Sequence, residues 1–167
     1  WQDLFESARE TTRLTAMLFM ILASAAIFGH VLTIMGLPSE LVASVTKAGV
    51  GSVAFILLTM GVIFILGMFL ETIAIILVTT PIILPVLDSL SINPVWYGIL
   101  LMINLELALI TPPVGMNLFV IKGIAKAPME DVIFGIIPYV LLMLLGLVIV
   151  LIFPQLALWL PATMGYG

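Results

Sequence analysis

The hydrophobic and polar positions divide the chain into long apolar stretches separated by short polar or proline-containing segments. An amphipathic start over residues 1–13 is followed by apolar stretches over 14–35, 51–88, 95–121 and 132–153. A helix needs about 20 apolar residues to cross a bilayer, and each of these stretches reaches that length. The pattern therefore predicts an all-α membrane protein, built as a polytopic helical bundle.

The first 13 residues mix apolar and charged side chains. Leu4 and Phe5 alternate with acidic and basic residues, which is typical of a helix that lies at the membrane interface before a span begins. A frayed polar end is the alternative. We expect the first span over 14–35, followed by a short helix from about 40 to 48.

The apolar stretch over 51–88 is too long for one crossing and short for two crossings with a loop. It is interrupted near its middle by a segment that contains Gly67, Glu71 and Thr72. A re-entrant hairpin of two half-depth helices would explain both observations, and two full crossings joined by a tight turn are the alternative. Because an ionisable residue at membrane depth is costly, the hairpin tip is a candidate for binding substrate or ions. In a surface loop, by contrast, Glu71 would merely be solvated.

The span over 95–121 carries a second interruption, formed by Thr111, Pro112, Pro113 and Gly115. Two adjacent prolines followed by a glycine cannot continue a regular helix, so this span is predicted to be broken. Such backbone is tolerated in a membrane only where it is buried in protein or lines a wet cavity. Its free carbonyls, the Thr111 hydroxyl and the Asn117 amide would supply the hard oxygen ligands that sodium prefers. A simple proline kink that serves packing is the alternative.

Two further polar residues, Asn104 and Glu106, lie in the helix before this break. Either residue could contact substrate or ions. Equally, both could belong to a structural hydrogen-bond network.

Composition supports the membrane assignment and narrows the chemistry. Of 167 residues, 63% are hydrophobic and 8% are charged, whereas soluble domains carry about 25% charged residues. The absence of cysteine excludes disulfides and thiol catalysis. No phosphate-binding loop, metalloprotease motif or catalytic triad is visible, so we expect neither an enzyme nor an organic cofactor, and no nucleic-acid partner. Because the chain begins at Trp1, we expect a fragment of a longer protein.

The basic residues predict an orientation. Arg9, Arg13, Lys122 and Lys126 are expected on one side of the membrane, and Lys47 on the other. Cytoplasmic loops carry an excess of Lys and Arg, so the side with four basic residues is predicted to be cytoplasmic. The hairpin would then enter from the outside.

Several sequence segments occur together in a characteristic order. They are residues 67–72 (GMFLET), 80–86 (TPIILPV), 93–98 (NPVWYG) and 110–119 (ITPPVGMNLF), followed by the closing prolines at 154 and 161. In this order they resemble the large membrane subunit, of the DctM type, of tripartite ATP-independent periplasmic (TRAP) transporters. The likeness covers nearly the whole chain but only the C-terminal part of that subunit, because the family's first half is missing.

The resemblance implies part of a sodium-driven importer of small organic acids, of the C4-dicarboxylate or sugar-acid class. It implies a bacterial or archaeal cytoplasmic membrane, a small membrane subunit of the DctQ type and an extracytoplasmic solute-binding protein of the DctP type. The fold would be an inverted repeat in which each half has a re-entrant hairpin and a broken helix. An ion-coupled anion carrier without a binding protein and a non-transporting membrane scaffold subunit are the alternatives.

The resemblance also assigns expected site positions. The second hairpin tip would hold Gly67, Glu71 and Thr72, with Glu71 at a position where the family often has aspartate. The second broken helix would hold Thr111, Pro112, Pro113, Gly115 and Asn117. Sodium, as the coupling ion, would bind at Thr111, Gly115 and Gly67.

Overall fold

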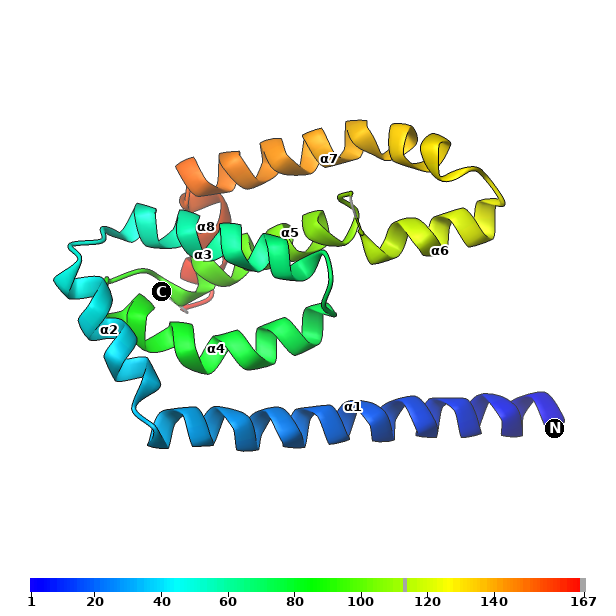
Figure 1. Ribbon diagram of the computed structural model, residues 1–167, viewed down its shortest axis with the longest axis horizontal. Coiled ribbons are helices and arrows are strands. Elements are labelled where there is room, and N and C mark those ends of the chain that lie inside the picture. Colours follow the sequence, from blue (N-terminus) through cyan, green and yellow to red (C-terminus); the bar gives the residue numbers. More distant parts are fainter. Residues whose placement is uncertain (113, 166–167) are drawn as a thin grey trace.

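A computed structural model describes residues 1–112 and 114–165, and these residues form eight helices and no strand (Figure 1). The all-α membrane bundle that the sequence predicts is therefore confirmed for the described residues. The helices, in chain order, are α1 (Gln2–Ile34), α2 (Leu37–Lys47), α3 (Ser52–Gly67), α4 (Thr72–Ser89), α5 (Pro94–Leu109), α6 (Met116–Ala125), α7 (Met129–Ile152) and α8 (Gln155–Thr163).

Three of these helices, α1, α4 and α7, are long and apolar enough to cross a membrane. The 33 residues of α1 correspond to about 50 Å at ~1.5 Å per residue, which exceeds the hydrocarbon thickness of a bilayer. Gly29 is the only buried residue of α1, and Val132 is the only one of α7. Most of the surface of both helices is therefore left for lipid or for other protein.

The first helix differs from the predicted division into an interfacial helix over 1–13 and a span over 14–35. In the structure both stretches belong to the single helix α1, which has no break near residue 13. The physical reason is that no proline or glycine occurs between residues 2 and 28, so nothing interrupts the backbone hydrogen bonds. The charged segment is the polar beginning of a long helix.

The core is built from α3, α4 and α5. Figure 1 shows α3 and α4 running antiparallel, with the turn between them ending well short of the N-terminal end of α1. Helices α1 and α2 pack on α4, α3 packs on α5, and α7 lies against α5 and α6. Within these three helices, the largest fully buried side chains are Ile56, Ile63, Val86, Leu87, Leu100 and Leu105.

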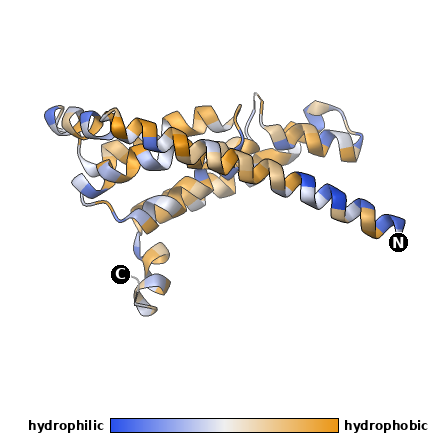
Figure 2. Cartoon of the chain, turned by 90° about the horizontal axis from the view of Figure 1, so that it is seen from below, coloured by the Kyte–Doolittle hydropathy of each residue, from blue (hydrophilic) through white to orange (hydrophobic). Residues whose placement is uncertain are grey.

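The polar residues gather at the ends of the molecule. Figure 2 shows hydrophilic residues at the start of α1 and around the connection between α6 and α7, with largely hydrophobic helices between the ends. Figure 1 shows that these two segments lie at the same end of the molecule, whereas α2, which ends at Lys47, lies at the opposite end. Arg9, Arg13, Lys122 and Lys126 are thus separated from Lys47 along the long axis.

The last helix, α8, was not foreseen in the sequence, where Pro154 only indicates the end of the preceding span. Pro154 does follow the end of α7, but it is also the N-cap of α8. Proline is tolerated in the first turn of a helix because the amide that it lacks would have no partner there. One proline therefore separates two helices.

Candidate functional site

The turn between α3 and α4 is short and hydrogen-bonded. Four residues, Met68–Glu71, connect the two helices, and the Leu66 carbonyl accepts a hydrogen bond from the amide of Leu70 at 2.9 Å. Glu71 is the N-cap of α4, and its carboxylate accepts a hydrogen bond from the amide of Ala74 at 3.2 Å. Because the first amides of a helix have no partner within it, this contact stabilises the start of α4.

Gly67 brings this turn into close contact with α5. A Cβ atom added at Gly67 would lie 2.8 Å from the Cβ of Ala108 and 3.4 Å from a methyl group of Leu105. Carbon atoms of real side chains do not approach to 2.8 Å, so only glycine permits this helix spacing. Ala108 belongs to the last turn of α5, and the contact therefore holds the hairpin turn beside the end of that helix.

Thr72 contributes an unpaired polar group at the same turn. Its hydroxyl oxygen is buried and has no hydrogen-bond partner among the described residues. A buried hydroxyl without a partner is unfavourable unless another group completes its hydrogen bonds. Of the three residues predicted at the tip, Thr72 therefore has an oxygen that is still free to contact a bound species.

The break between α5 and α6 leaves backbone carbonyl groups without helical partners. The Leu109 carbonyl would normally accept from the amide three or four residues later, but Pro112 and Pro113 occupy those positions and have no N–H. Pro113 itself lies outside the described residues. The Thr111 amide donates to the Ala108 carbonyl at 3.3 Å, and the Thr111 hydroxyl donates to the Leu107 carbonyl.

Gly115 closes the break at a point that lies close to two carbonyl oxygens. Its backbone is left-handed, with φ of 41°, and a Cβ atom there would lie 2.9 Å from the Thr111 oxygen and 3.2 Å from the Leu109 oxygen. Glycine is needed for the backbone angle and for the space. The absent side chain thus lets the backbone lie close to two carbonyl oxygens, which are the hard ligands that alkali and alkaline-earth cations take. A methyl group of Leu118 lies 3.0 Å from the same Cβ position, so this point is closely packed.

The start of α6 faces the same break. Gly115 is its N-cap and provides no side-chain hydrogen bond, although the Leu118 amide donates to the Gly115 carbonyl at 2.8 Å. The predicted ligand Asn117 is exposed on the first turn of α6. The amides of this turn are therefore less satisfied than those of α4, where Glu71 provides a cap.

Asn104 and Glu106 are not brought to the hairpin turn. Asn104 is 3% exposed, and its amide group donates to the Met60 carbonyl of α3 at 3.0 Å. Successive residues of a helix differ by about 100°, so Glu106 projects away from the side on which Leu105 and Ala108 meet Gly67. Asn104 joins α5 to α3, whereas the Glu106 side chain is exposed.

The acidic side chains do not form a metal site. Within residues 1–112 and 114–165, no three His, Cys, Asp or Glu residues come together in a group that could hold a metal ion. A cation at the break would therefore be bound mainly by backbone and hydroxyl oxygens. This is the kind of ligand set that the sequence predicts for sodium.

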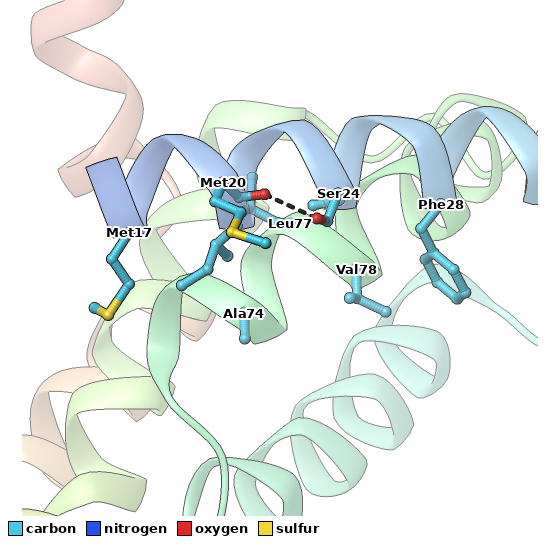
Figure 3. Close-up of a pocket in the computed structure, with 9 residues that line it drawn as sticks. Met17, Met20, Ser24, Phe28, Ala74, Leu77 and Val78 are labelled. Atoms are coloured by element: carbon cyan, nitrogen blue, oxygen red, sulfur yellow. Dashed lines mark hydrogen bonds between the residues drawn. The ribbon is translucent and has the colours of Figure 1, made fainter. Parts of the chain in front are cut away.

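A separate hollow of about 540 Å³ lies between α1 and α4 (Figure 3). Its walls are mostly apolar, with Met17, Met20 and Phe28 on α1 and Leu77 on α4. The polar Ser24 on this surface already donates its hydroxyl to the Met20 carbonyl at 2.8 Å. Because the hollow has no convergent free polar groups, it is a weaker candidate site than the hairpin turn and the break.

Two groups that shape the site, the Ala108 side chain and the Leu109 carbonyl, were not predicted from the sequence. Ala108 determines how closely the hairpin turn can approach, and its signal is a small residue one turn before a predicted break. The Leu109 carbonyl is the second contributor. It could have been found by asking which carbonyl loses both possible donors to adjacent prolines.

Comparison with known proteins identifies the family of the chain. Residues 1–156 match the family model described as the DctM component of tripartite ATP-independent periplasmic transporters. The chain is 39% identical over 93% of its length to a C4-dicarboxylate TRAP transporter large permease of Pseudomonas aeruginosa, and 37% identical over 91% to its counterpart in Vibrio cholerae. An ectoine/5-hydroxyectoine large permease of Ruegeria pomeroyi is 32% identical over 95% of the chain.

The chain spans about a third of the length of these relatives, 36%, 34% and 37% respectively. The family is one of transport proteins and not of enzymes, in agreement with the expectation from the sequence. Together with the apolar helices, the match makes this a multi-pass membrane protein. The chain belongs to the DctM component family of TRAP transporters.

Proposed function

We propose that the chain is the C-terminal part of the large permease of a sodium-coupled importer of small organic acids. In this proposal the helix pair α3–α4 is a re-entrant hairpin and α5–α6 is a broken transmembrane helix. The complete transporter would include a small membrane subunit and an extracytoplasmic solute-binding protein, and would work in the cytoplasmic membrane of a bacterium or archaeon.

The observation that carries the proposal is the contact of Gly67 with Ala108. It joins the turn between α3 and α4 to the last turn before the break, so two interrupted helices meet at one place. In secondary transporters, substrate and coupling-ion sites are formed where interrupted helices meet near the middle of the bilayer. The 16 residues of α3 correspond to about 24 Å, which is short for a full crossing and supports a hairpin, whereas the 18 residues of α4 reach the lower end of the length needed to cross.

The sodium ion would bind beside Gly115. The carbonyl oxygens of Leu109 and Thr111 both lie near the space that a side chain at Gly115 would fill. The Thr111 hydroxyl and the backbone at Gly67 would complete the oxygen ligands, while Pro112 and Pro113 keep the carbonyls free. A substrate carboxylate would meet the first turn of α6, including Asn117, since Glu71 already caps α4.

The substrate class follows only from the relatives. Two of them are named for C4-dicarboxylates and one for ectoine and 5-hydroxyectoine. We propose a small solute that carries a carboxylate. In a tripartite system the binding protein and the remainder of the permease would make the finer choice.

The proposal is tested by uptake in proteoliposomes that contain the full-length parent, its small subunit and its binding protein. C4-dicarboxylate uptake is measured under an inward sodium gradient, an inward proton gradient and no gradient. We expect uptake only with sodium. Thr111→Ala should lower it about tenfold or more, because the variant loses a ligand and the hydroxyl that supports the break.

Thr46→Ala is the matched control, because Thr46 makes the same type of bond, from its hydroxyl to the Val42 carbonyl, at an exposed position of α2. Its uptake should equal that of the unaltered protein. Uptake driven equally by protons would overturn the sodium assignment. No uptake under any gradient, in a complex that assembles and inserts normally, would favour the non-transporting scaffold.

A further inference from the structure

The Glu106 side chain is an exposed carboxylate, and it lies far from both ends of the stretch formed by α5 and α6. It lies 12 residues after Pro94, the first residue of α5, which corresponds to about 18 Å along the helix. Beyond it come the break and the ten residues of α6, which add about 15 Å on the other side. With α5 and α6 in a bilayer about 30 Å thick, Glu106 is placed near the middle of the hydrocarbon.

The surrounding face of α5 is left open by the described residues. Val95 is 40% exposed and Met102 is 47% exposed, and with Glu106 they follow the spacing of one helical face. The opposite face is covered, because Leu101, Asn104, Leu105 and Ala108 are buried. The open face is thus apolar except for one carboxylate.

This chain has no Lys or Arg that belongs to that face. Its five Lys and Arg residues are Arg9, Arg13, Lys47, Lys122 and Lys126. They lie at the two ends of the molecule, on the first turns of α1, at the end of α2 and around the connection between α6 and α7. Any Lys or Arg that pairs with Glu106 must therefore come from outside residues 1–167.

A carboxylate facing lipid at mid-depth is strongly unfavourable, and such residues face the protein interior, pair with an opposite charge or line a water-filled cavity. The chain spans only about a third of the length of its relatives, so most of the permease polypeptide is available to cover this face. A helix that packs against Val95 and Met102 would also remove the exposed apolar surface of α5.

We propose that the open face of α5 packs against a transmembrane helix from the remainder of the large permease, and that this helix carries a Lys or Arg that pairs with Glu106. The pair is an assembly contact between two parts of one polypeptide. It rests on the proposed placement of α5 and α6 across the membrane within the large permease, but on neither sodium coupling nor the substrate. The pair can therefore be absent while sodium-coupled uptake holds, and present while sodium coupling fails.

The test uses the full-length parent purified in detergent, with the apparent melting temperature as the readout. Glu106→Gln keeps the shape of the side chain and removes its charge, which leaves a buried cation unpaired. We expect the melting temperature to fall by about 5 °C or more, and further for Glu106→Lys. Glu130→Gln is the matched control, because Glu130 is exposed in the first turn of α7, and it should change the value by about 1–2 °C at most.

A charge exchange identifies the partner. In the Glu106→Lys background, replacing each intramembrane Lys or Arg of the remaining permease by Glu should restore the melting temperature at one position only. A structure of the unaltered parent provides a second measurement that does not require a stable variant. It should place a Lys or Arg nitrogen within about 4 Å of the Glu106 carboxylate.

The proposal is overturned by any of three results. An unchanged or raised melting temperature for Glu106→Gln would mean that the carboxylate faces water or lipid. An effect that appears only when the small membrane subunit is bound would assign the cation to that subunit. A structure with no basic side chain near Glu106 would contradict the pair directly.

Discussion

At the scale of single residues, position 67 has the strictest requirement for one residue type, because only glycine fits there. Its α-carbon faces the Cβ of Ala108, at a spacing that leaves no room for a further carbon atom. Neither atom belongs to a flexible side chain, so a collision can be relieved only by moving α3 away from α5. Helix spacing at the hairpin turn is therefore controlled by one glycine and one alanine.

Gly67→Ala should destabilise the full-length protein by about 1–3 kcal/mol, because overpacking in a close contact forces the backbone to shift. The measurement is the apparent melting temperature in detergent. Ala108→Gly in the same molecule should recover much of the loss, since it removes the atom with which the new Cβ collides.

Gly61→Ala is the matched control, because Gly61 lies in the same helix with no atom within 4 Å of the position that a Cβ would take. It should be neutral or slightly stabilising, as alanine is the better helix former. Equal destabilisation by both substitutions would contradict a specific contact at Gly67.

Asn104 shows what residue chemistry alone leaves undecided. The sequence places the Asn104 amide in the helix before the break, where a site ligand and a structural hydrogen bond are equally reasonable. The structure gives its amide group a partner in α3, the Met60 carbonyl, at 3.0 Å. That partner is 44 residues away in the sequence, so no local pattern could have indicated it.

At the scale of elements, the two helix interruptions were predictable because their causes are local. Two prolines remove adjacent amide donors, and glycine provides the left-handed backbone that ends the break at residue 115. What was not predictable is that the turn after Gly67 meets the end of α5, because this depends on how α3 and α5 pack. Likewise, the direction in which Glu106 projects became clear only from which side of α5 is covered.

Gly115→Ala should impair sodium-driven uptake, which depends on the geometry of the break, more than it impairs folding and membrane insertion. The left-handed backbone costs an L-residue about 1–2 kcal/mol, and the new Cβ would lie 2.9 Å from the Thr111 oxygen. The carbonyl oxygens of the break would have to move, so we expect sodium-driven uptake to fall about tenfold or more while membrane insertion is unchanged. Proteoliposome uptake and the yield of inserted protein measure the two effects.

Gly123→Ala serves as the control for this substitution. Gly123 lies in the same helix α6, outside the left-handed backbone region and with open space around its Cβ position. Uptake should stay at the level of the unaltered protein. If Gly115→Ala transports normally, the carbonyl oxygens beside Gly115 do not form the ion site.

At the scale of the whole molecule, the structure shows which basic residues lie at the same end, and their distribution predicts the orientation in the membrane. The start of α1 and the connection between α6 and α7 lie at one end, with Arg9, Arg13, Lys122 and Lys126, while α2 ends with Lys47 at the other (Figure 1). By the excess of basic residues, we predict that the first end is cytoplasmic. Since α3 starts beside α2, the proposed hairpin would then enter from outside.

Cysteine labelling tests this orientation without changing any charge. Ala48→Cys and Ala125→Cys, each introduced as the only cysteine of the full-length parent, are exposed neighbours of Lys47 and Lys126 at opposite ends. A membrane-impermeant maleimide added to intact spheroplasts should label residue 48, and should label residue 125 only after lysis. The reverse pattern would place the hairpin opening in the cytoplasm. Labelling of both residues before lysis would mean that the long axis of the bundle does not cross the membrane, and the mid-depth positions of the break and of Glu106 would then be wrong as well.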